Sequence, residues 1–512
     1  MKIFKISYAL LLGGAMLSCT KLNQKLRSEV DSASSSVTAA GLLQSTYESM
    51  NGPYQDQAGI WCQQEMTTDE CVGPTRAGDW DDNGVWRVLH AHTWAADHGF
   101  AAGNFNGLLQ TQFAASSVLA RSPSTQQAAE ARFIRALSMF TVLDIWDQVP
   151  YRGDISDLKV LPETKKGKDC ADFLITELEA IINDLPNGTP TTAIKANKNA
   201  ARALLMKLYL NRGVYANRAS PTFDNADMAK VISNADQITG YSLTSNYYKN
   251  FSKDNETAST ENIFSLENTY GVRGGNNQSR WYCTLHYNQN PSGWNGFTTL
   301  SDFYNKFGAS DKRRGDTYTG VTDVTGLRVG LLVGQQYDQN GTALKDRSGA
   351  PLAFTPAVAL TENGNNLEVT GIRVIKYPPD LVHNFAADND MAILRYADVM
   401  LMKAEAIVRS GGSNAAALEL VNQVRRRAYG SFPLTTANPV ADLTGPLTLD
   451  NLIDERGREL YWESWRRNDL VRFGKFLQPT QLRGASDAKR LIFPIPSDQL
   501  ALNPNLTQNP GY

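Results

Sequence analysis

Tryptophan residues are concentrated in two short windows of this 512-residue chain. The first window, 61–94, holds four of the nine tryptophans, and the second, 281–294, holds two more. Aromatic rings stack on the apolar face of a sugar ring, while carboxylate, amide and guanidinium groups bind its hydroxyls. The windows therefore favour a carbohydrate-binding surface built from loops. We expect its residues to be the following: Asp69, Trp80, Trp86, Trp281, Tyr282, Cys283, Trp294 and Arg373.

The two windows suggest different roles for their residues. In the first, Trp80 or Trp86 is the expected stacking platform, and Asp69 is the expected hydroxyl acceptor. In the second, an extended backbone would place Trp281 and Cys283 on one face and the tyrosine between them on the other, because side chains alternate along a strand. Each tryptophan also has an alternative role, which is packing between a loop and its scaffold.

The stretch 78–86, GDWDDNGVW, begins like a calcium loop. Asp79, Asp81, Asn83 and Gly84 fit the pattern D-x-[DN]-x-[DN]-G. Such a loop closes with a bidentate glutamate at its twelfth position, which is His90 here. Asn-Gly is a strong turn dipeptide. We therefore expect a tight turn that presents the flanking tryptophans, with no metal site and no cofactor, although a less regular structural calcium ion stays open.

Three nearby carboxylates raise the alternative of a glycoside hydrolase. Glu65, Asp69 and Glu70 would have to place two carboxyl groups about 5–9.5 Å apart for that chemistry, and sequence proximity does not set such a separation. The chain has no G-x-S-x-G, H-E-x-x-H or P-loop pattern. Cys62 and Cys71 do not have a zinc spacing, and a disulfide between them stays open. We expect a binding protein and no catalytic residues.

The composition of the chain limits the classes of ligand and partner that we expect it to bind. The net charge is −2 and 20% of residues are charged, so no global field indicates nucleic acid. The near-zero charge and the absence of a basic cluster favour a neutral oligosaccharide, and a fructan or an α-glucan would both fit. A hydrophobic content of 42% is typical of a folded globular chain.

The N-terminus has the features of a targeting segment. Lys2 and Lys5 precede a mostly apolar stretch, 6–17, which is too short for a bilayer span of roughly 20 residues. The stretch ends in MLSCT, which resembles a bacterial lipobox with Cys19 as the lipidated residue. We expect a signal peptide at 1–18, a flexible tether at 19–39 and a single domain at 40–512.

Helical periodicity appears in two blocks separated by an irregular region. The first block has expected helices at 126–149, 172–186, 197–213 and 225–239, and the second at 395–412, 414–428 and 447–475. Residues 241–393 are rich in glycine, asparagine, threonine and aromatics. The predicted fold is mainly α. Tetratricopeptide-like helix pairs in the N-terminal part (40–240) and the C-terminal part (394–512) form a scaffold. The insertion 241–393 is irregular and ligand-binding, with a few short strands.

Details of the helices are also predicted. Gly213 is expected to end the third helix. The arginines 425–427 are expected to face mostly outward. In the last and longest helix, i,i+4 ion pairs are expected between Asp454 and Arg458 and between the residues 463 and 467.

Four C-terminal blocks resemble the SusD/RagB family of Bacteroidetes outer-membrane lipoproteins. They are LRYADVMLMKAEAIVRSGG (394–412), ALELVNQVRRRA (417–428), LIDERGRELYWESWRRNDLVRFGK (452–475) and IFPIPSDQLALNPNLTQNPGY (492–512). The resemblance implies a nutrient-binding protein, not an enzyme, anchored in the outer membrane by lipid at Cys19 and facing the extracellular side. It also implies delivery of an oligosaccharide to a SusC-like TonB-dependent transporter. A tetratricopeptide-like protein-interaction scaffold remains the alternative.

Overall fold

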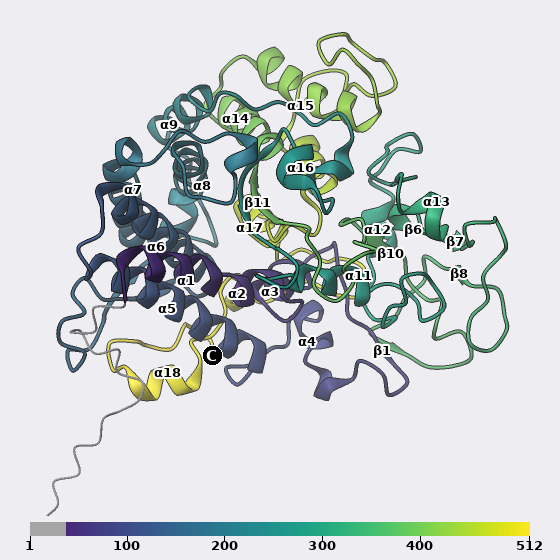
Figure 1. The fold of residues 1–512 in the computed structure, drawn as a ribbon, viewed down its shortest axis with the longest axis horizontal. Helices are drawn as coiled ribbons and strands as arrows, with labels where there is room; N and C mark the ends of the chain where they lie inside the picture. Colours follow the sequence, from purple (N-terminus) through teal and green to yellow (C-terminus); the bar gives the residue numbers. More distant parts are fainter. Residues whose placement is uncertain (1–36) are drawn as a thin grey trace, which may run out of the picture. The chain divides into compact units, whose positions relative to one another are not determined.

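The alanine-rich and amphipathic segments of the sequence form helices in the computed structural model, which describes residues 37–512 (Figure 1). The N-terminal helices are α1 (Ala39–Ser49), α2 (Asn51–Gln55), α3 (Ile60–Glu65), α4 (Arg87–His90), α5 (Gly99–Leu119), α6 (Thr125–Trp146), α7 (Gly167–Ile181), α8 (Lys198–Ala216) and α9 (Asn225–Asp236). The later helices are α10 (Asn255–Ala258), α11 (Ser279–Tyr282), α12 (Ser301–Tyr304), α13 (Thr322–Thr325), α14 (Tyr396–Arg409), α15 (Asn414–Ala428), α16 (Leu449–Leu460), α17 (Arg466–Arg472) and α18 (Ser497–Leu502).

Residues 39–512 form one compact unit. The expected signal peptide, the lipidation site Cys19 and most of the tether 19–39 lie outside the described residues. Across the described part of the chain, no helix combines the length and the apolar character that a membrane span requires.

Consecutive helices pack as pairs, as the sequence predicts. α5 packs on α6, α7 and α9 both pack on α8, and α14 packs on α15. Local signals set several helix starts: Ser124 and Gln127 form a capping box at α6, and Asn197 caps α8. The predicted stop at Gly213 is wrong, because α8 continues to residue 216. The mainly α scaffold is confirmed, and it includes helices that the periodicity did not indicate, of which α1 and α5 are the longest.

The strands are short and occur in small separate sheets. They are β1 (Thr75–Arg76), β2 (Gln148–Tyr151), β3 (Glu163–Lys166), β4 (Asn262–Leu266), β5 (Gly315–Asp316), β6 (Val329–Leu332), β7 (Gly334–Gln335), β8 (Ala353–Phe354), β9 (Thr361–Glu362), β10 (Arg373–Ile375) and β11 (Met391–Arg395). The largest sheet has the order β10-β6-β5 and is antiparallel, while β11 pairs with β4 across a register shift. Within the compact unit, β6, β7, β8 and β10 lie on the side away from α7, α8 and α9 (Figure 1).

The segment 447–475, predicted as one long helix, is two helices, α16 and α17. Between them Trp462 and Ser464 have positive φ, 60° and 68°, so the helix cannot continue. The carboxylates of the first window fix this turn. Glu65 Oε1 accepts a hydrogen bond from the Ser464 N–H (2.5 Å), and Glu70 Oε2 accepts one from the Trp462 N–H (3.2 Å). A contact between distant parts of the chain therefore ends the helix.

The arginines 425–427, predicted to face outward, are buried in an ionic network. Arg427 binds Glu261 and Glu459, and Arg425 binds Glu455 at 2.9 Å. Burial would raise the pKa of Glu455, but the arginines around it outweigh burial and hold its pKa well below the usual range. Buried charges are tolerated when they are paired and hydrogen-bonded, and here each arginine has carboxylate partners from other elements.

The predicted i,i+4 ion pairs of the last helix are also wrong. Asp454 binds Lys306 at 2.7 Å, and Arg458 binds the carboxylate three residues before it. Glu463 binds Lys376 at 2.5 Å and Arg395 at 2.7 Å. Tertiary partners replace the local ones because the helix is interrupted and its polar side chains point into the molecule.

Candidate functional site

A cavity of about 520 Å³ opens beside α11, within the region predicted to be irregular. Among the described residues, its lining combines three aromatic rings with polar side chains that are nearly all uncharged. The lining residues are Asp56, Gln57, Asn276, Gln278, Ser279, Tyr282, Asn290, Pro291, Ser292, Gly293, Trp294, Asn384 and Phe385. Asp56 is the one charged side chain of this lining. The cavity is therefore suited to a ligand with apolar faces and many uncharged polar groups.

The three aromatic rings of the cavity form a continuous surface. The ring of Tyr282 lies 5.5 Å from Trp294 at an interplanar angle of 23°, and 6.1 Å from Phe385 at 27°. Trp294 is 46% exposed and Phe385 is 87% exposed, whereas Tyr282 is nearly buried between them. A contiguous exposed apolar patch is typical of a binding surface, whereas single exposed hydrophobic residues are ordinary. The two outer rings present free faces to an incoming ligand.

Polar atoms of the cavity wall lack partners. Gln278 Oε1, Ser279 Oγ and Asn384 Oδ1 are buried and have no hydrogen-bond partner among the described residues. Other atoms of the wall are already occupied: the Tyr282 hydroxyl donates to the Asn384 carbonyl at 2.5 Å, and the Gln278 amide donates to the Phe385 carbonyl at 3.1 Å. A buried polar atom without a partner costs about 1–3 kcal/mol. Ligand hydroxyl groups would provide the missing partners.

The loop that carries Trp294 folds back on itself. The Trp294 N–H donates to the Tyr282 carbonyl at 2.6 Å, and the Asn295 N–H donates to the Leu285 carbonyl at 2.8 Å. The Asn290–Pro291 peptide bond within it is cis. The loop is thus closed by backbone hydrogen bonds that bring the tryptophan beside the tyrosine of α11.

Arg373 holds the loop that carries Trp294 by hydrogen bonds and does not line the cavity. Its guanidinium is fully buried, with Nη2 donating to Asn295 Oδ1 at 2.8 Å and to the Glu368 carbonyl at 2.9 Å. Nη1 donates to the carbonyls of Thr370 and Gly371. Burial lowers the pKa of Arg373 well below its ordinary value, and the nearby guanidinium of residue 76 lowers it further. This corrects the expectation of a ligand-binding arginine: the side chain holds the residue that follows Trp294.

Trp80 connects the first window to the second. It is half-buried, and its Nε1 donates to the Trp294 carbonyl at 2.9 Å. The ring packs 6.3 Å from Trp294 and 4.7 Å from Phe297. Gly296 gives it room, because a Cβ there would lie 2.3 Å from the Trp80 ring. Trp80 therefore packs against Trp294 and supports it, but Trp80 is not part of the cavity lining.

Other expected binding residues are buried away from the cavity. Trp86 is 3% exposed and donates to Asp82 Oδ2 at 2.7 Å. Trp281 and Cys283 are fully buried. The expectation of an extended segment with both side chains on one face is wrong, because α11 is a helical turn. This corrects their assignment as ligand contacts, because a ring enclosed by protein cannot stack on a sugar. Tyr282 and Trp294 are the expected residues that do line the cavity.

The acidic residues of the first window have structural partners. Both carboxylate oxygens of Asp69 accept from Arg466 at 2.7 Å, which corrects its assignment as a hydroxyl acceptor. Glu65 and Glu70 are buried and hold the turn after α16, so neither lines the cavity. Cys62 and Cys71 are free buried thiols, which answers the open question of a disulfide.

The stretch 78–86 is the tight turn that the sequence predicts. Asn83 and Gly84 have positive φ, 55° and 80°, within a short 3-10 turn. Asp81 accepts a hydrogen bond from Arg87. The carboxylates that resemble a calcium loop thus bind neighbouring side chains.

Several cavity residues were missed by reasoning from the sequence. The main ones are Phe385 and Asn384, in the run LVHNFAADND, and the polar residues 276–279. A single phenylalanine within a polar run between two strands was an available signal.

Comparisons with known proteins agree with this architecture. A family model described as the SusD family matches residues 260–486, which confirms the predicted resemblance. The chain is 27% identical to the starch-binding protein SusD of Bacteroides thetaiotaomicron, over 88% of this chain and 84% of that protein.

Solved structures share the fold. A laminarin-binding SusD-like protein superimposes with a TM-score of 0.68 at 21% identity, covering 93% of this chain and 99% of that one. Surface glycan-binding protein A from Bacteroides thetaiotaomicron, in complex with laminarihexaose, gives a TM-score of 0.62 at 18% identity, covering 92% and 98%. At these identities the likeness concerns the fold.

Proposed function

We propose that this chain, a member of the SusD family, captures a neutral oligosaccharide in the cavity between Trp294 and Phe385. One observation carries the proposal: two exposed aromatic rings flank a wall whose buried polar atoms lack partners. Aromatic faces match the apolar faces of sugar rings, and the amide and hydroxyl groups match their hydroxyls.

The charge of the cavity supports a neutral ligand. Polyanionic ligands are usually bound by arginine, which pairs with carboxylate or phosphate groups in a bidentate manner. The lining contains no arginine or lysine, and Asp56 would repel an anion. A single carboxylate is well suited to accept hydrogen bonds from sugar hydroxyls.

The relatives support the choice of ligands to test. Their names refer to starch, laminarin and laminarihexaose, which are all glucans. A first panel therefore contains malto-oligosaccharides, laminari-oligosaccharides and fructo-oligosaccharides, with a polyuronate as the charged comparison.

Titration calorimetry of the purified protein against this panel tests the proposal. We expect saturable binding of at least one neutral oligosaccharide, with an affinity reduced at least about 10-fold by Trp294→Ala or Phe385→Ala. Phe113→Ala is the matched control, because Phe113 is also an exposed phenylalanine, at 43%, but does not line the cavity. The control should bind like the wild type.

The opposite result would favour the alternative function. If Trp294→Ala and Phe385→Ala melt like the wild type and retain glycan on an affinity gel, the cavity is not the binding site. If the wild type binds no oligosaccharide of the panel, the helix pairs are better explained as a protein-interaction scaffold. Release of reducing sugar by the purified protein would instead favour a glycoside hydrolase.

We also propose that the protein acts as a lipid-anchored receptor of the outer membrane, facing outward, that passes its ligand to a SusC-like TonB-dependent transporter. The family membership and the lipobox-like MLSCT motif support this role. Cys19→Ala should release the protein from the membrane fraction without changing its glycan affinity. Recovery of such a transporter with the wild-type protein, from cells grown on the bound glycan, tests the partnership.

A further inference from the structure

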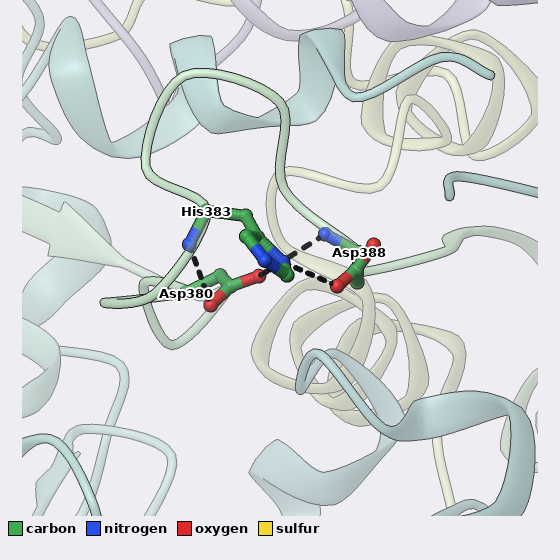
Figure 2. Close-up of side chains that lie close together, drawn as sticks. All are labelled: Asp380, His383 and Asp388. Atoms are coloured by element: carbon green, nitrogen blue, oxygen red, sulfur yellow. Dashed lines mark hydrogen bonds and ion pairs between the residues drawn. The ribbon is translucent and has the colours of Figure 1, made fainter. Parts of the chain in front are cut away.

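A cluster of one histidine and two carboxylates closes the loop that carries Phe385. Figure 2 shows Asp380, His383 and Asp388 converging, all three from this loop. His383 Nδ1 lies 2.7 Å from Asp388 Oδ2 and 3.6 Å from Asp380 Oδ2. One ligand atom of each residue lies within 4.8 Å of the other two. Imidazole nitrogen and carboxylate oxygen are common ligands of divalent metal ions.

Backbone N–H groups hold each carboxylate of the cluster through Oδ1, and the Asp388 N–H also donates to Asp380 Oδ2 at 3.3 Å. Asp380 Oδ1 accepts from the N–H groups of Val382 (3.0 Å) and His383 (3.2 Å). Asp388 Oδ1 accepts from the Tyr270 N–H at 2.6 Å. The second oxygen of each carboxylate is the one that points to the imidazole. Such anchoring orients metal ligands in known sites.

The imidazole is also held in place. Its ring stacks on Tyr270, with centroids 4.0 Å apart and an interplanar angle of 5°. The side chain of Asp380 is fully buried, while those of His383 and Asp388 are 31% and 30% exposed. The cluster is therefore fixed on its inner side and open to solvent on the other, which gives an ion and its water ligands access.

We propose that Asp380, His383 and Asp388 form a binding site for a divalent d-block metal ion such as zinc. Zinc takes four ligands at about 2.0–2.2 Å, which places tetrahedral ligand atoms about 3.4 Å apart. The present separations of 2.7 and 3.6 Å lie on either side of that value, so small shifts would complete the set. Water supplies the fourth ligand. Binding of the ion requires that the coordinating imidazole nitrogen carry no proton.

The donor set distinguishes this ion from calcium. Calcium takes six to eight oxygen ligands at about 2.3–2.6 Å, whereas this cluster offers a nitrogen and two carboxylates. Lys253 is the cation against the cluster, with Nζ 3.9 Å from Asp380 Oδ1. Its side chain is half exposed and lies at the anchored oxygen, not at the oxygen that faces His383. The two carboxylates balance the charge of a divalent ion, and Lys253 adds one positive charge beside the anchored oxygen.

The site would also affect the aromatic cavity, and this consequence rests on the proposed function. Asn384 and Phe385 follow His383 directly and line the cavity. An ion that ties His383 to both ends of the loop would restrict Phe385, whose ring has little cover of its own. Because ordering a binding loop in advance lowers its cost on binding, the ion should strengthen glycan binding.

Zinc titration of the untagged full-length protein, after treatment with a chelator, tests the site. We expect one equivalent of Zn²⁺ to bind by calorimetry, and Co²⁺ to give a visible spectrum of a nitrogen- and oxygen-liganded ion. His383→Gln and the double variant Asp380→Asn/Asp388→Asn should each weaken binding by about 100-fold or more. His98→Gln is the control, since His98 contacts the Val85 carbonyl and no carboxylate, and it should bind zinc like the wild type.

The outcomes separate the metal site from the proposed function. Three results would overturn the site: no stoichiometric binding of zinc or cobalt, binding of calcium alone, or zinc binding that survives His383→Gln. The three side chains would then only hold the loop together by hydrogen bonds. A titration with the bound glycan follows: zinc should raise its affinity about 5-fold in the wild type and leave it unchanged in His383→Gln. Zinc binding without glycan binding would retain the site and reject the proposed function.

Discussion

The tryptophan-rich windows 61–94 and 281–294 differ in what lies against their rings. In the first, Trp61 packs 5.0 Å from Trp462, and Trp94 stacks 4.3 Å from Phe493. These partners come from the far end of the chain and enclose the rings completely. In the second, one face of Trp294 rests on Tyr282 and the side chain remains 46% exposed. The first window joins the two ends of the chain, whereas the second presents a surface.

This difference shows that the same residue type serves two purposes within one molecule. A buried tryptophan contributes area removed from water, and an exposed one keeps a face free for a ligand at some cost in stability. The four predictions below test this contrast, beginning with the largest expected effect.

Trp86→Ala should destabilise the protein by about 3–5 kcal/mol, because it empties a buried site against Phe100 and Phe297. Chemical unfolding monitored by circular dichroism measures the change. A loss below about 1 kcal/mol would mean that this ring is not part of the core, and the contrast between the windows would fail.

Glu65 should make stability depend on pH. Burial raises its pKa to about 7, from an ordinary value of 4.5. The folded state then holds the proton more tightly than the unfolded state, so this contribution is complete below about pH 4.5 and is lost as the pH rises through 7. The raised pKa corresponds to about 3 kcal/mol.

Glu65→Gln tests this effect, because glutamine imitates the protonated carboxyl and can still accept from the Ser464 N–H. The variant also lowers the pKa of Glu70, which burial and the Glu65 carboxylate raise, so it removes pH dependence from both groups. Between pH 5 and pH 8 the unfolding free energy of the wild type should fall by about 2–3 kcal/mol more than that of the variant. Equal slopes in the two proteins would contradict the prediction. Asp390, whose pKa burial raises to about 8, is unchanged in both.

Trp294→Ala should affect glycan affinity more than stability, in contrast to the loss of stability expected for Trp86→Ala. We expect glycan affinity to fall by about 1–3 kcal/mol, equivalent to roughly 5- to 150-fold, while the unfolding free energy changes by less than about 1 kcal/mol. Calorimetry and unfolding curves of the same preparation give both values. A large loss of stability with unaltered affinity would place this ring among the structural ones.

Trp80→Phe should give the smallest effect and report on the link between the windows. It removes the hydrogen bond from Nε1 to the Trp294 carbonyl and keeps most of the ring contacts. A neutral hydrogen bond contributes about 0.5–1.5 kcal/mol, so stability should fall by that amount and glycan affinity by a few-fold. If stability and glycan affinity are both unchanged, Trp80 does not position Trp294.

Some features of the fold and of the site could be predicted, and particular residues show why. The helix from 414 to 428 was predicted to the residue, because its amphipathic repeat and its cap are local. The direction of Arg425 and Arg427 was predicted wrongly, because their carboxylate partners lie in segments 30 or more residues away. For the cavity, Tyr282 and Trp294 were in the expected set, but Phe385 was not.

Patterns within the chain were enough to indicate the helical blocks, the family resemblance, the turn at 78–86 and the aromatic residues of the region around the cavity. These depend on spacing over a few residues or on motifs that stand in the chain. The tertiary structure alone decided which aromatic rings are covered and which polar atoms lack partners. Exposure depends on contacts such as Trp61 with Trp462, made across some four hundred residues. Local patterns carry no information about such contacts, because the partners are brought together only when the whole chain folds.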